Sequence, residues 1–563
     1  MKTIAKLRSA GSRHDLSILL GIPLKDLTYF AYGLNETAKY ASFSIPKKLG
    51  GARDISMPVG AFANIQKRIS KLLSDCAANI EEEKGVVAPH TYAQGFMRRR
   101  SIITNAKRHT NKRWVFNVDV EDFFPSINFG RVRGHFLKSR SFKLHHDVAT
   151  TLAQLTTFSG GLPQGSPSSP IVSNLVCQPL DYRLGRLAAA NRCTYTRYAD
   201  DITFSTNKAL FPNDIAALDA LGQWEVGVAL SDQLRNCGFK INVAKTRQQY
   251  YWSRQIVTGL TVNKLVNVDS RFIKDTRAQV DSFISTGTCY VSGTKKSIPL
   301  STPKLQGRLS HIYNVKASMI SYSRPSRPQL EPAWLKTHRK YLDFASFAST
   351  PGPVLITEGK SDAMYIRAAI LRLSHLHPSL LAPTAAARLR LYRYTQMGDV
   401  VQSLGGGTGD LKKFVAGYRD RVGRFSTASL DHPVIILVDN DKGGREVFAA
   451  GKMAGGLAVI DGSLPFYRIL ENLYLCSIPI TGGASSSCVE DCLSPRQKAV
   501  VLSGKTFHPD GAGFDPSNHF GKARLAERVL KNWKKHSFSG FIPIINTFRD
   551  IIADYESLKA APT

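Results

Sequence analysis

Two adjacent carboxylates, Asp200 and Asp201, stand where a strand-like segment reverses direction. Residues 194–198 and 202–205 are rich in Thr, Tyr, Ile and Phe, types that favour strands, so the pair is predicted at the tip of a hairpin. Two anionic oxygen ligands there suit a hard cation such as Mg²⁺, which keeps coordination positions open for substrate phosphates. The pattern favours a metal-dependent nucleotidyl transferase. An ordinary acidic turn explains these ten residues equally well.

A third carboxylate strengthens this interpretation. Trp114–Val118 predicts a short buried strand that delivers Asp119 at its end. In-line phosphoryl transfer can use two metal ions roughly 3.5–4 Å apart, and their ligands must converge from different elements. Between the acidic segments, residues 161–167 read Gly-Leu-Pro-Gln-Gly-Ser-Pro and predict a tight loop that presents the amide of Gln164. By itself this loop is only a turn.

In this order the three segments resemble the palm of a reverse transcriptase: a strand ending in Asp, a Leu-Pro-Gln-Gly loop and a Tyr-Ala-Asp-Asp turn. The resemblance implies that Asp119, Asp200 and Asp201 hold two Mg²⁺ ions and that Gln164 lies against the incoming nucleotide and template. Phe124 falls where the family places a bulky side chain that clashes with a ribose 2′-hydroxyl. We therefore expect dNTPs to be preferred over rNTPs.

Two cations extend the resemblance. Residues 45–55 look like the fingers of the same family, where Arg53 would meet the triphosphate. Gly238–Asn242 with Lys245 resembles the motif that follows the Asp-Asp hairpin, and Lys245 would protonate the pyrophosphate leaving group. In a protein this basic, either cation could instead be a solvated surface charge.

Among reverse transcriptases, the pattern is most similar to the bacterial retron type. The similarity rests on Ser101–Ala106 with His109, on Val257–Asn263 and on Leu19–Pro23. It implies that the region around Val257–Val262 helps to recognise a structured cognate non-coding RNA. The enzyme would copy that RNA into a branched, RNA-linked single-stranded DNA (msDNA). A thumb strand with a Gly bend is the structural interpretation of the same segment.

Composition agrees with a nucleic-acid partner. The chain has 75 Lys and Arg against 43 Asp and Glu, a formal charge of +32, which attracts phosphate backbones without specifying a sequence. No run of 18 apolar residues occurs, so neither a membrane span nor a membrane partner is expected, and we expect a bacterial cytoplasmic protein. The eight cysteines are scattered without a zinc-site spacing, so reduced thiols are expected.

The second half of the chain predicts another acidic centre. Val354–Thr357 and Val434–Val438 read as continuous apolar strands separated by helices, which is typical of a parallel sheet covered on both faces. Glu358 follows the first strand, and Asp439 and Asp441 follow the second. Because functional groups gather at the carboxyl ends of such strands, these carboxylates could form a Mg²⁺ site that binds one or two ions.

This arrangement resembles the Toprim domain of topoisomerases, bacterial primases and a class of nucleases. The resemblance implies that Glu358 acts as general acid or base and that Asp439 and Asp441 hold the metal. Glu490 and Asp491 could add a carboxylate or simply cap a helix. A flavodoxin-like sheet with incidental acidic turns is the alternative. Lys522 could contact a phosphate, although the start of a surface helix is the plainer interpretation.

We therefore expect a multidomain α+β and α/β protein, in which a right-hand polymerase fold precedes a mostly parallel Toprim sheet. Prolines near residues 323–353 mark the boundary. The predicted divisions are fingers and palm over 1–245, thumb and RNA-recognition region over 246–345, Toprim domain over 346–500 and a C-terminal helical extension over 501–563.

The expected function is reverse transcription of a cognate RNA with dNTPs, coupled to a Toprim nuclease effector in anti-phage defence. The nuclease would act on DNA or RNA and would be restrained by the bound msDNA. The sequence leaves open whether the protein forms a homo-oligomer that carries the msDNA. The alternatives are another reverse transcriptase, of the intron-maturase or diversity-generating type, and a non-catalytic RNA-binding scaffold. Three clustered carboxylates without cations would repel one another, which argues against the scaffold.

Overall fold

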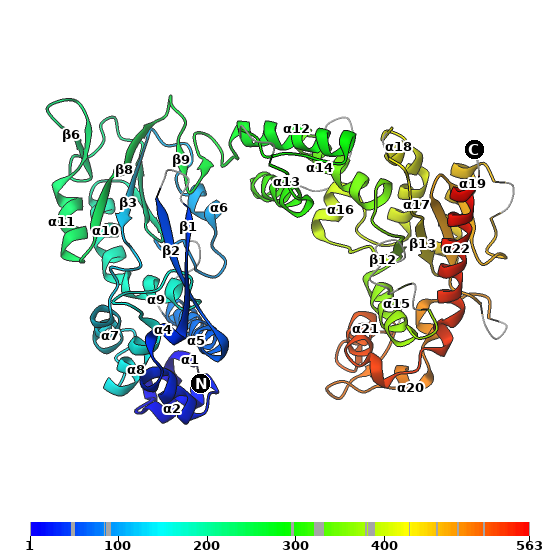
Figure 1. The fold of residues 1–563 in the computed structure, drawn as a ribbon, viewed down its shortest axis with the longest axis horizontal. Helices are drawn as coiled ribbons and strands as arrows, with labels where there is room; N and C mark the ends of the chain where they lie inside the picture. Colours follow the sequence, from blue (N-terminus) through cyan, green and yellow to red (C-terminus); the bar gives the residue numbers. More distant parts are fainter. Residues whose placement is uncertain are drawn as a thin grey trace. The chain divides into compact units, whose positions relative to one another are not determined.

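The computed structural model of the 563-residue chain forms two compact units, Met1–Ser270 and Arg271–Thr563 (Figure 1). It describes residues 2–46, 51–83, 85, 92–293, 298–319, 331–377, 380, 389–426, 428–457, 460–480, 484–509 and 513–561. Within these ranges, no helix combines the length and the apolar character that crossing a membrane requires.

The α-helices and strands of the first unit have the following bounds, in chain order: α1 (Thr3–Ser9), α2 (Arg13–Leu20), α3 (Leu24–Thr28), α4 (Glu36–Lys39), β1 (Tyr40–Pro46), β2 (Ala52–Pro58), α5 (Gly60–Glu83), α6 (Ile102–Lys107), β3 (Trp114–Glu121), α7 (Phe129–Lys138), α8 (His146–Thr156), α9 (Ser169–Val176), α10 (Gln178–Ala190), β4 (Thr194–Tyr198), β5 (Asp201–Thr206), β6 (Ala216–Leu218), β7 (Trp224–Val226), α11 (Val228–Asn236), β8 (Lys240–Tyr250), β9 (Ile256–Val257) and β10 (Leu260–Thr261).

An antiparallel sheet with strand order β4-β5-β3-β8 positions the acidic segments of this unit. The predicted hairpin is confirmed as β4 and β5, and residues such as Phe116 and Phe204 are buried in the core. The strand expected over 114–118 is longer. It continues to Glu121 because Asp119, Val120 and Glu121 pair with β8.

Helices cover the sheet and supply the rest of the core. The long helix α5 is amphipathic and buries Ile65, Ile69, Leu73 and Ile80, which recur at helical spacing. These side chains join the sheet residues and the buried faces of α7–α10 in one hydrophobic cluster. The hairpin β1–β2 is largely exposed.

The α-helices and strands of the second unit have the following bounds: α12 (Ser270–Thr286), α13 (Thr302–Ala317), α14 (Ala333–Asp343), β11 (Val354–Thr357), α15 (Lys360–Arg372), β12 (Arg390–Leu391), α16 (Gln396–Gln402), α17 (Thr408–Ala416), α18 (Tyr418–Val422), β13 (Val434–Val438), α19 (Lys442–Gly455), β14 (Tyr467–Leu470), β15 (Leu473–Ser477), α20 (Pro495–Lys498), β16 (Thr506–Phe507), β17 (His519–Phe520), α21 (Lys522–Lys531) and α22 (Ile542–Ala560).

The main sheet of this unit has strand order β12-β11-β13-β15-β14 and is parallel except for the edge strand β14. Its central strands are buried on both faces. Ile356 and Ile436 belong to one hydrophobic cluster with α17 and α19, whereas Leu355 and Ile435 belong to another with α15, α21 and α22. Figure 1 shows β13 among these helices. The strand predictions over 354–357 and 434–438 are confirmed.

The range predicted as thumb and RNA-recognition region, 246–345, is divided between the units. Residues 246–270 belong to the first unit, while α12–α14 belong to the second. Aromatic packing explains the division, because Phe283 of α12 contacts Phe344, which in turn contacts Phe425. The two compact units therefore divide at residue 270. Pro325 and Pro328 of the expected linker, with the rest of 320–330, lie outside the described residues.

Candidate active site

The first unit brings the three predicted polymerase carboxylates to one end of its sheet. Asp119 on β3 lies directly opposite Asp201 on β5, and Asp200 occupies the turn before β5. Two features shape this turn: Ala199 adopts a left-handed conformation with φ 56°, and the Val120 amide donates to the Asp200 carbonyl at 3.0 Å. The cross-strand register thus groups carboxylates that lie far apart in the sequence.

Burial makes this cluster electrostatically unfavourable without added cations. It raises the pKa of Asp201 to about 6, with the charge of Asp200 adding to the effect and Arg247 opposing it. Burial also raises the pKa of Asp200, and the charge of Asp119 contributes. Arg247 was not foreseen from the sequence, and it pairs with Asn117 of β3 where the register of β8 is irregular.

Lys245 lies against the first carboxylate. Its ammonium nitrogen is 3.0 and 3.2 Å from the two Asp119 oxygens, and the Asn242 amide donates to Oδ1 at 3.1 Å. Among the described residues, no group of three or more His, Cys, Asp or Glu side chains is arranged to hold a metal ion. The all-oxygen donor set and the raised pKa values nevertheless fit Mg²⁺, because a divalent cation would relieve the repulsion.

A buried arginine fixes the Asp-Asp turn. Arg197 is fully buried and donates two hydrogen bonds to Asp181, at 2.8 and 2.7 Å. A third nitrogen donates to the Ala199 carbonyl at 3.2 Å. Sequence reasoning treated Arg197 as a strand residue only. A charged side chain at an inward strand position indicated a buried partner. The neighbouring residues, however, did not identify Asp181 on α10 as that partner.

A buried histidine joins both strands of the same hairpin. His109 Nδ1 is 2.7 Å from the Ser205 hydroxyl on β5, and Nε2 is 2.7 Å from the Thr196 hydroxyl on β4. Burial lowers the pKa of His109 to about 3, so the ring is neutral near pH 7. Because its exposure is zero, His109 supports the site instead of touching a ligand.

The Leu-Pro-Gln-Gly loop packs against strand β2. The Ser56 amide donates to the Gln164 carbonyl at 2.7 Å, and the Gln164 side chain is half-buried. Gly165 has φ 116°, and a Cβ there would lie 2.8 Å from Ile55 Cγ2. Both the backbone conformation and this close approach require glycine. Gln66, also not foreseen, accepts from the Ser166 hydroxyl at 2.9 Å beneath the loop.

The remaining nucleotide-binding candidates lie on neighbouring segments. Phe124 is half-buried, its ring lies 6.4 Å from that of Phe96, and its carbonyl accepts from the Leu162 amide at 3.1 Å. Arg53 is exposed on β2, and its charge lowers the pKa of Asp200 against the larger effect of burial. Residues 47–50 of the expected fingers segment lie outside the described residues.

The second unit gathers the other predicted carboxylates at the carboxyl ends of β11 and β13. Glu358 follows β11, Asp439 follows β13, and Asp441 caps α19 by accepting from the Gly444 amide at 2.8 Å. Asp439 Oδ1 accepts from the Val489 amide at 3.1 Å. One Glu358 oxygen, Oε2, is buried and has no hydrogen-bond partner in the part of the chain that the structure describes.

These carboxylates also repel one another in a buried setting. Burial raises the pKa of Asp439 to about 7, and the charges of Asp362, Glu358 and Glu490 add to the shift. Burial and the charge of Asp441 raise the pKa of Glu358. Asp362 was not foreseen as a member of this cluster. Its position three residues after Gly359, from whose amide it accepts at 2.7 Å, marks it as a helix cap.

The neighbouring acids Glu490 and Asp491 take different positions. Glu490 is buried and pairs with Lys522 at 3.1 Å, whereas Asp491 accepts from the Cys488 amide at 2.9 Å and pairs with Lys498 at 3.2 Å. Asp491 therefore caps its turn, and Glu490 faces the acidic cluster. Burial lowers the pKa of Lys522, but the charge and hydrogen bond of Glu490, together with Cys488 and Asp439, raise it above its usual value.

Known proteins resemble the first half of this chain. Residues 45–279 match the family described as "Reverse transcriptase (RNA-dependent DNA polymerase)". The retron Mx162 reverse transcriptase of Myxococcus xanthus is 35% identical over 280 residues, which cover 46% of this chain and 54% of that protein. The retron Ec86 reverse transcriptase of Escherichia coli is 33% identical over 190 residues, covering 34% and 55%.

The chain thus spans about half the length of these relatives. A solved apo telomerase from Candida tropicalis is 14% identical with a TM-score of 0.30, covering 58% of this chain and 61% of that one, and this score is too low to establish a shared fold. Residues 45–279 therefore resemble a reverse transcriptase domain, and the proteins similar to this part of the chain include retron reverse transcriptases.

Proposed function

We propose that the chain is a retron-type RNA-directed DNA polymerase. The observation that carries the proposal is the cross-strand pairing of Asp119 with Asp201 beside Asp200, at the end of a sheet within the matched domain. Asp119, Asp200 and Asp201 would hold Mg²⁺, which when bound stabilises the attacking and leaving oxygens of phosphoryl transfer.

The protein's own side chains then bind and orient the substrates. Arg53 neutralises triphosphate charge from β2, and Gln164 lies on a loop that β2 holds in place. Phe124 excludes a 2′-hydroxyl by contact with the sugar. Lys245 is a proton donor placed at the carboxylate cluster, where its ammonium already contacts Asp119, and it would protonate the departing pyrophosphate.

Primer extension tests the polymerase proposal. Asp200→Ala together with Asp201→Ala should abolish dNTP incorporation on an RNA template with Mg²⁺. Asp26→Ala with Glu36→Ala removes two exposed acids and should leave synthesis unchanged. Unchanged synthesis by the first variant would refute the site. Phe124→Ala should raise rNTP incorporation relative to dNTP incorporation, and equal discrimination would remove Phe124 from the assignment.

The retron assignment implies a specific RNA and a branched product. The similarity to retron enzymes over 280 residues supports it. Sequencing the nucleic acid that copurifies with the protein tests it directly, since msDNA joined to RNA through a 2′-linkage is expected. An unlinked complementary DNA, or RNA alone, would favour an intron-maturase or diversity-generating enzyme, or an RNA-binding scaffold.

We further propose that the second unit is a Mg²⁺-dependent nuclease of the Toprim type, active in anti-phage defence and restrained by the bound msDNA. The partly buried cluster of Glu358, Asp439 and Glu490 favours this function, because its mutual repulsion calls for a cation. Glu358 would transfer the proton, and Asp439 and Asp441 would hold the metal.

Nuclease assays on protein stripped of DNA test this second function. With Mg²⁺, cleavage of DNA or RNA is expected, Glu358→Ala should abolish it, and returned msDNA should suppress it. Glu446→Ala is a matched control, because Glu446 lies exposed and pairs with Lys412 at 3.4 Å. Absence of cleavage, or cleavage by Glu358→Ala equal to that of the unchanged protein, would refute the nuclease proposal.

A further inference from the structure

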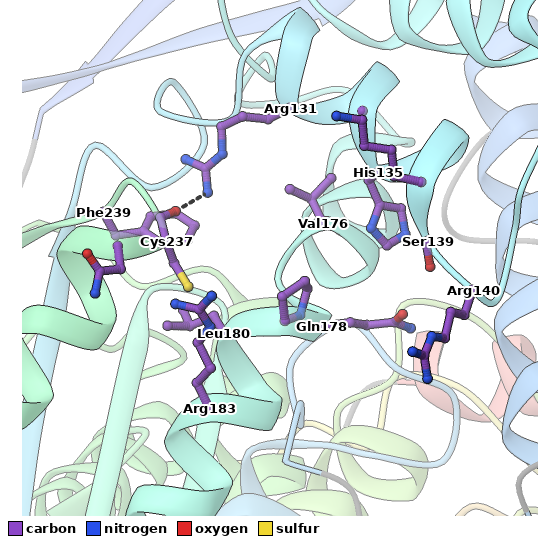
Figure 2. A pocket seen from close by; sticks show the side chains of 14 residues that line it. Arg131, His135, Ser139, Arg140, Val176, Gln178, Leu180, Arg183, Cys237 and Phe239 are labelled. Atoms are coloured by element: carbon purple, nitrogen blue, oxygen red, sulfur yellow. Dashed lines mark hydrogen bonds between the residues drawn. The ribbon is translucent and has the colours of Figure 1, made fainter.

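A basic pocket of about 510 Å³ lies in the first unit, apart from the carboxylate cluster (Figure 2). Its walls come from α7, from the start of α10 and from the segment between α11 and β8. None of the predicted polymerase carboxylates lines it. Its volume falls in the range of roughly 300–1,000 Å³ that is common for small-ligand sites.

The pocket combines unpaired cations with an apolar wall. Lys138, Arg140 and Arg183 lie at its edge, and none of them makes an ion pair within the described part of the chain. No Asp or Glu lines the pocket, while Val176 and Leu180 provide apolar surface. Such a pocket attracts an anion that also carries an apolar part.

Arg131 holds one wall rigid. Its guanidinium donates to the carbonyls of Ser126, Cys237 and Gly238 at 2.9, 2.8 and 3.2 Å and lies 4.2 Å above the centre of the Phe239 ring. Figure 2 shows the bond to Cys237. Because this charge is fixed in place, an anion would gain its attraction without ordering the side chain.

A histidine in the pocket wall has an unpaired polar atom. His135 Nε2 is buried and has no hydrogen-bond partner among the described residues, and Figure 2 shows its ring among the lining side chains. Burial lowers the pKa of His135 to about 4, so the ring is neutral near pH 7. A buried unpaired nitrogen costs free energy, and a hydroxyl or base edge of a ligand would satisfy it.

We propose that this pocket binds one unpaired nucleotide of RNA. The phosphate would lie against Lys138, Arg140 and Arg183, and the base or sugar against Val176, Leu180 and His135. A duplex keeps its bases stacked inside, so a pocket with apolar walls selects a flipped or single-stranded nucleotide. The inference rests on the proposed RNA-binding function and adds a contact outside the catalytic centre.

Charge reversal tests the phosphate contact. Lys138→Glu, Arg140→Glu and Arg183→Glu would be combined, with Lys25→Glu, Lys67→Glu and Lys71→Glu as a control of equal charge change on exposed helix positions. The probe is a labelled single-stranded RNA of mixed sequence, about 20 nucleotides long so that it exceeds a typical single-strand site. Mg²⁺ and dNTPs are left out, so that no catalysis contributes.

We expect the pocket variant to bind this RNA at least about tenfold more weakly than the control variant. The log–log slope of its affinity against salt should become shallower by roughly 0.7 for each phosphate that the variant no longer neutralises. His135→Phe should also weaken binding but leave that slope unchanged. Equal affinities of the pocket and control variants would overturn the inference while leaving the polymerase intact, whereas failure of the wild type to bind any RNA would overturn both.

Alkylation of Cys237 separates RNA from free nucleotides. Cys237 lines the pocket, and Cys193 in the same unit is a half-buried internal reference. The RNA should slow iodoacetamide labelling of Cys237 but not of Cys193, as measured by mass spectrometry. Protection by AMP at the same nucleotide concentration, without protection by RNA, would overturn the RNA assignment.

Discussion

Replacing His109 by phenylalanine should loosen the hairpin that carries Asp200 and Asp201. The substitution keeps an aromatic ring but removes two hydrogen bonds of 2.7 Å, leaving the Thr196 and Ser205 hydroxyls buried without partners. Each unsatisfied buried group costs about 1–3 kcal/mol. The first unit should therefore lose about 2–6 kcal/mol, or roughly 4–24 °C in Tm for a unit of this size.

His338 offers a matched control for the same substitution. It is also buried, but neither of its ring nitrogens has a hydrogen-bond partner. His338→Phe removes no hydrogen bond, so its unfolding free energy should change by less than about 1 kcal/mol or rise. Thermal and urea unfolding of both variants would be compared with primer extension at a temperature where both remain folded.

His109→Phe should lower dNTP incorporation even where the protein remains folded, because the carboxylates depend on the register of β4 and β5. If His109→Phe and His338→Phe change stability equally, the two short hydrogen bonds do not stabilise the hairpin. If synthesis is unaffected in a clearly destabilised His109→Phe protein, the link between hairpin and catalysis is wrong.

Three further changes probe the same unit. Gly165→Ala should cost about 1–3 kcal/mol in thermal unfolding because of its positive φ, whereas Gly134→Ala, with open space around it on α7, should be neutral or stabilising. Arg197→Met should cost about 3–5 kcal/mol by leaving the buried Asp181 carboxylate without its cation, and adding Asp181→Leu should restore part of that loss in urea titrations. Burial lowers the pKa of folded His109 to about 3. The contribution of neutral His109 to the free energy of unfolding should therefore be fully present above pH 6.5 and should fall towards pH 3, by up to about 1.4 kcal/mol per pH unit. In acid unfolding, the stability of His109→Phe should depend less steeply on pH.

Much of the local structure followed from residue patterns. The alternation around Asp200 and Asp201 predicted β4 and β5, and the apolar runs over 354–357 and 434–438 predicted β11 and β13 with their following acids. Strand alternation and apolar runs depend on nearest neighbours, so a sequence displays them directly. The roles of these acids in catalysis remain predictions.

Other features came only from packing across long sequence separations. Residue types gave no sign that Asp181 would neutralise Arg197, or that His109 would join strands 87 and 96 residues away. Likewise, only the fold places basic side chains of α7 and α10 around one pocket.

By itself, the sequence determined the identity and order of the chemical groups, from Asp119 through the Asp-Asp pair to Glu358 and Asp439, because those depend on local spacing. Tertiary structure decided which groups share an environment. It buried Asp201 beside Asp200, set Lys245 against Asp119, placed Glu490 inward and Asp491 outward, and packed α12–α14 with the second unit. Burial and charge pairing depend on the whole packed chain, so no local pattern encodes them.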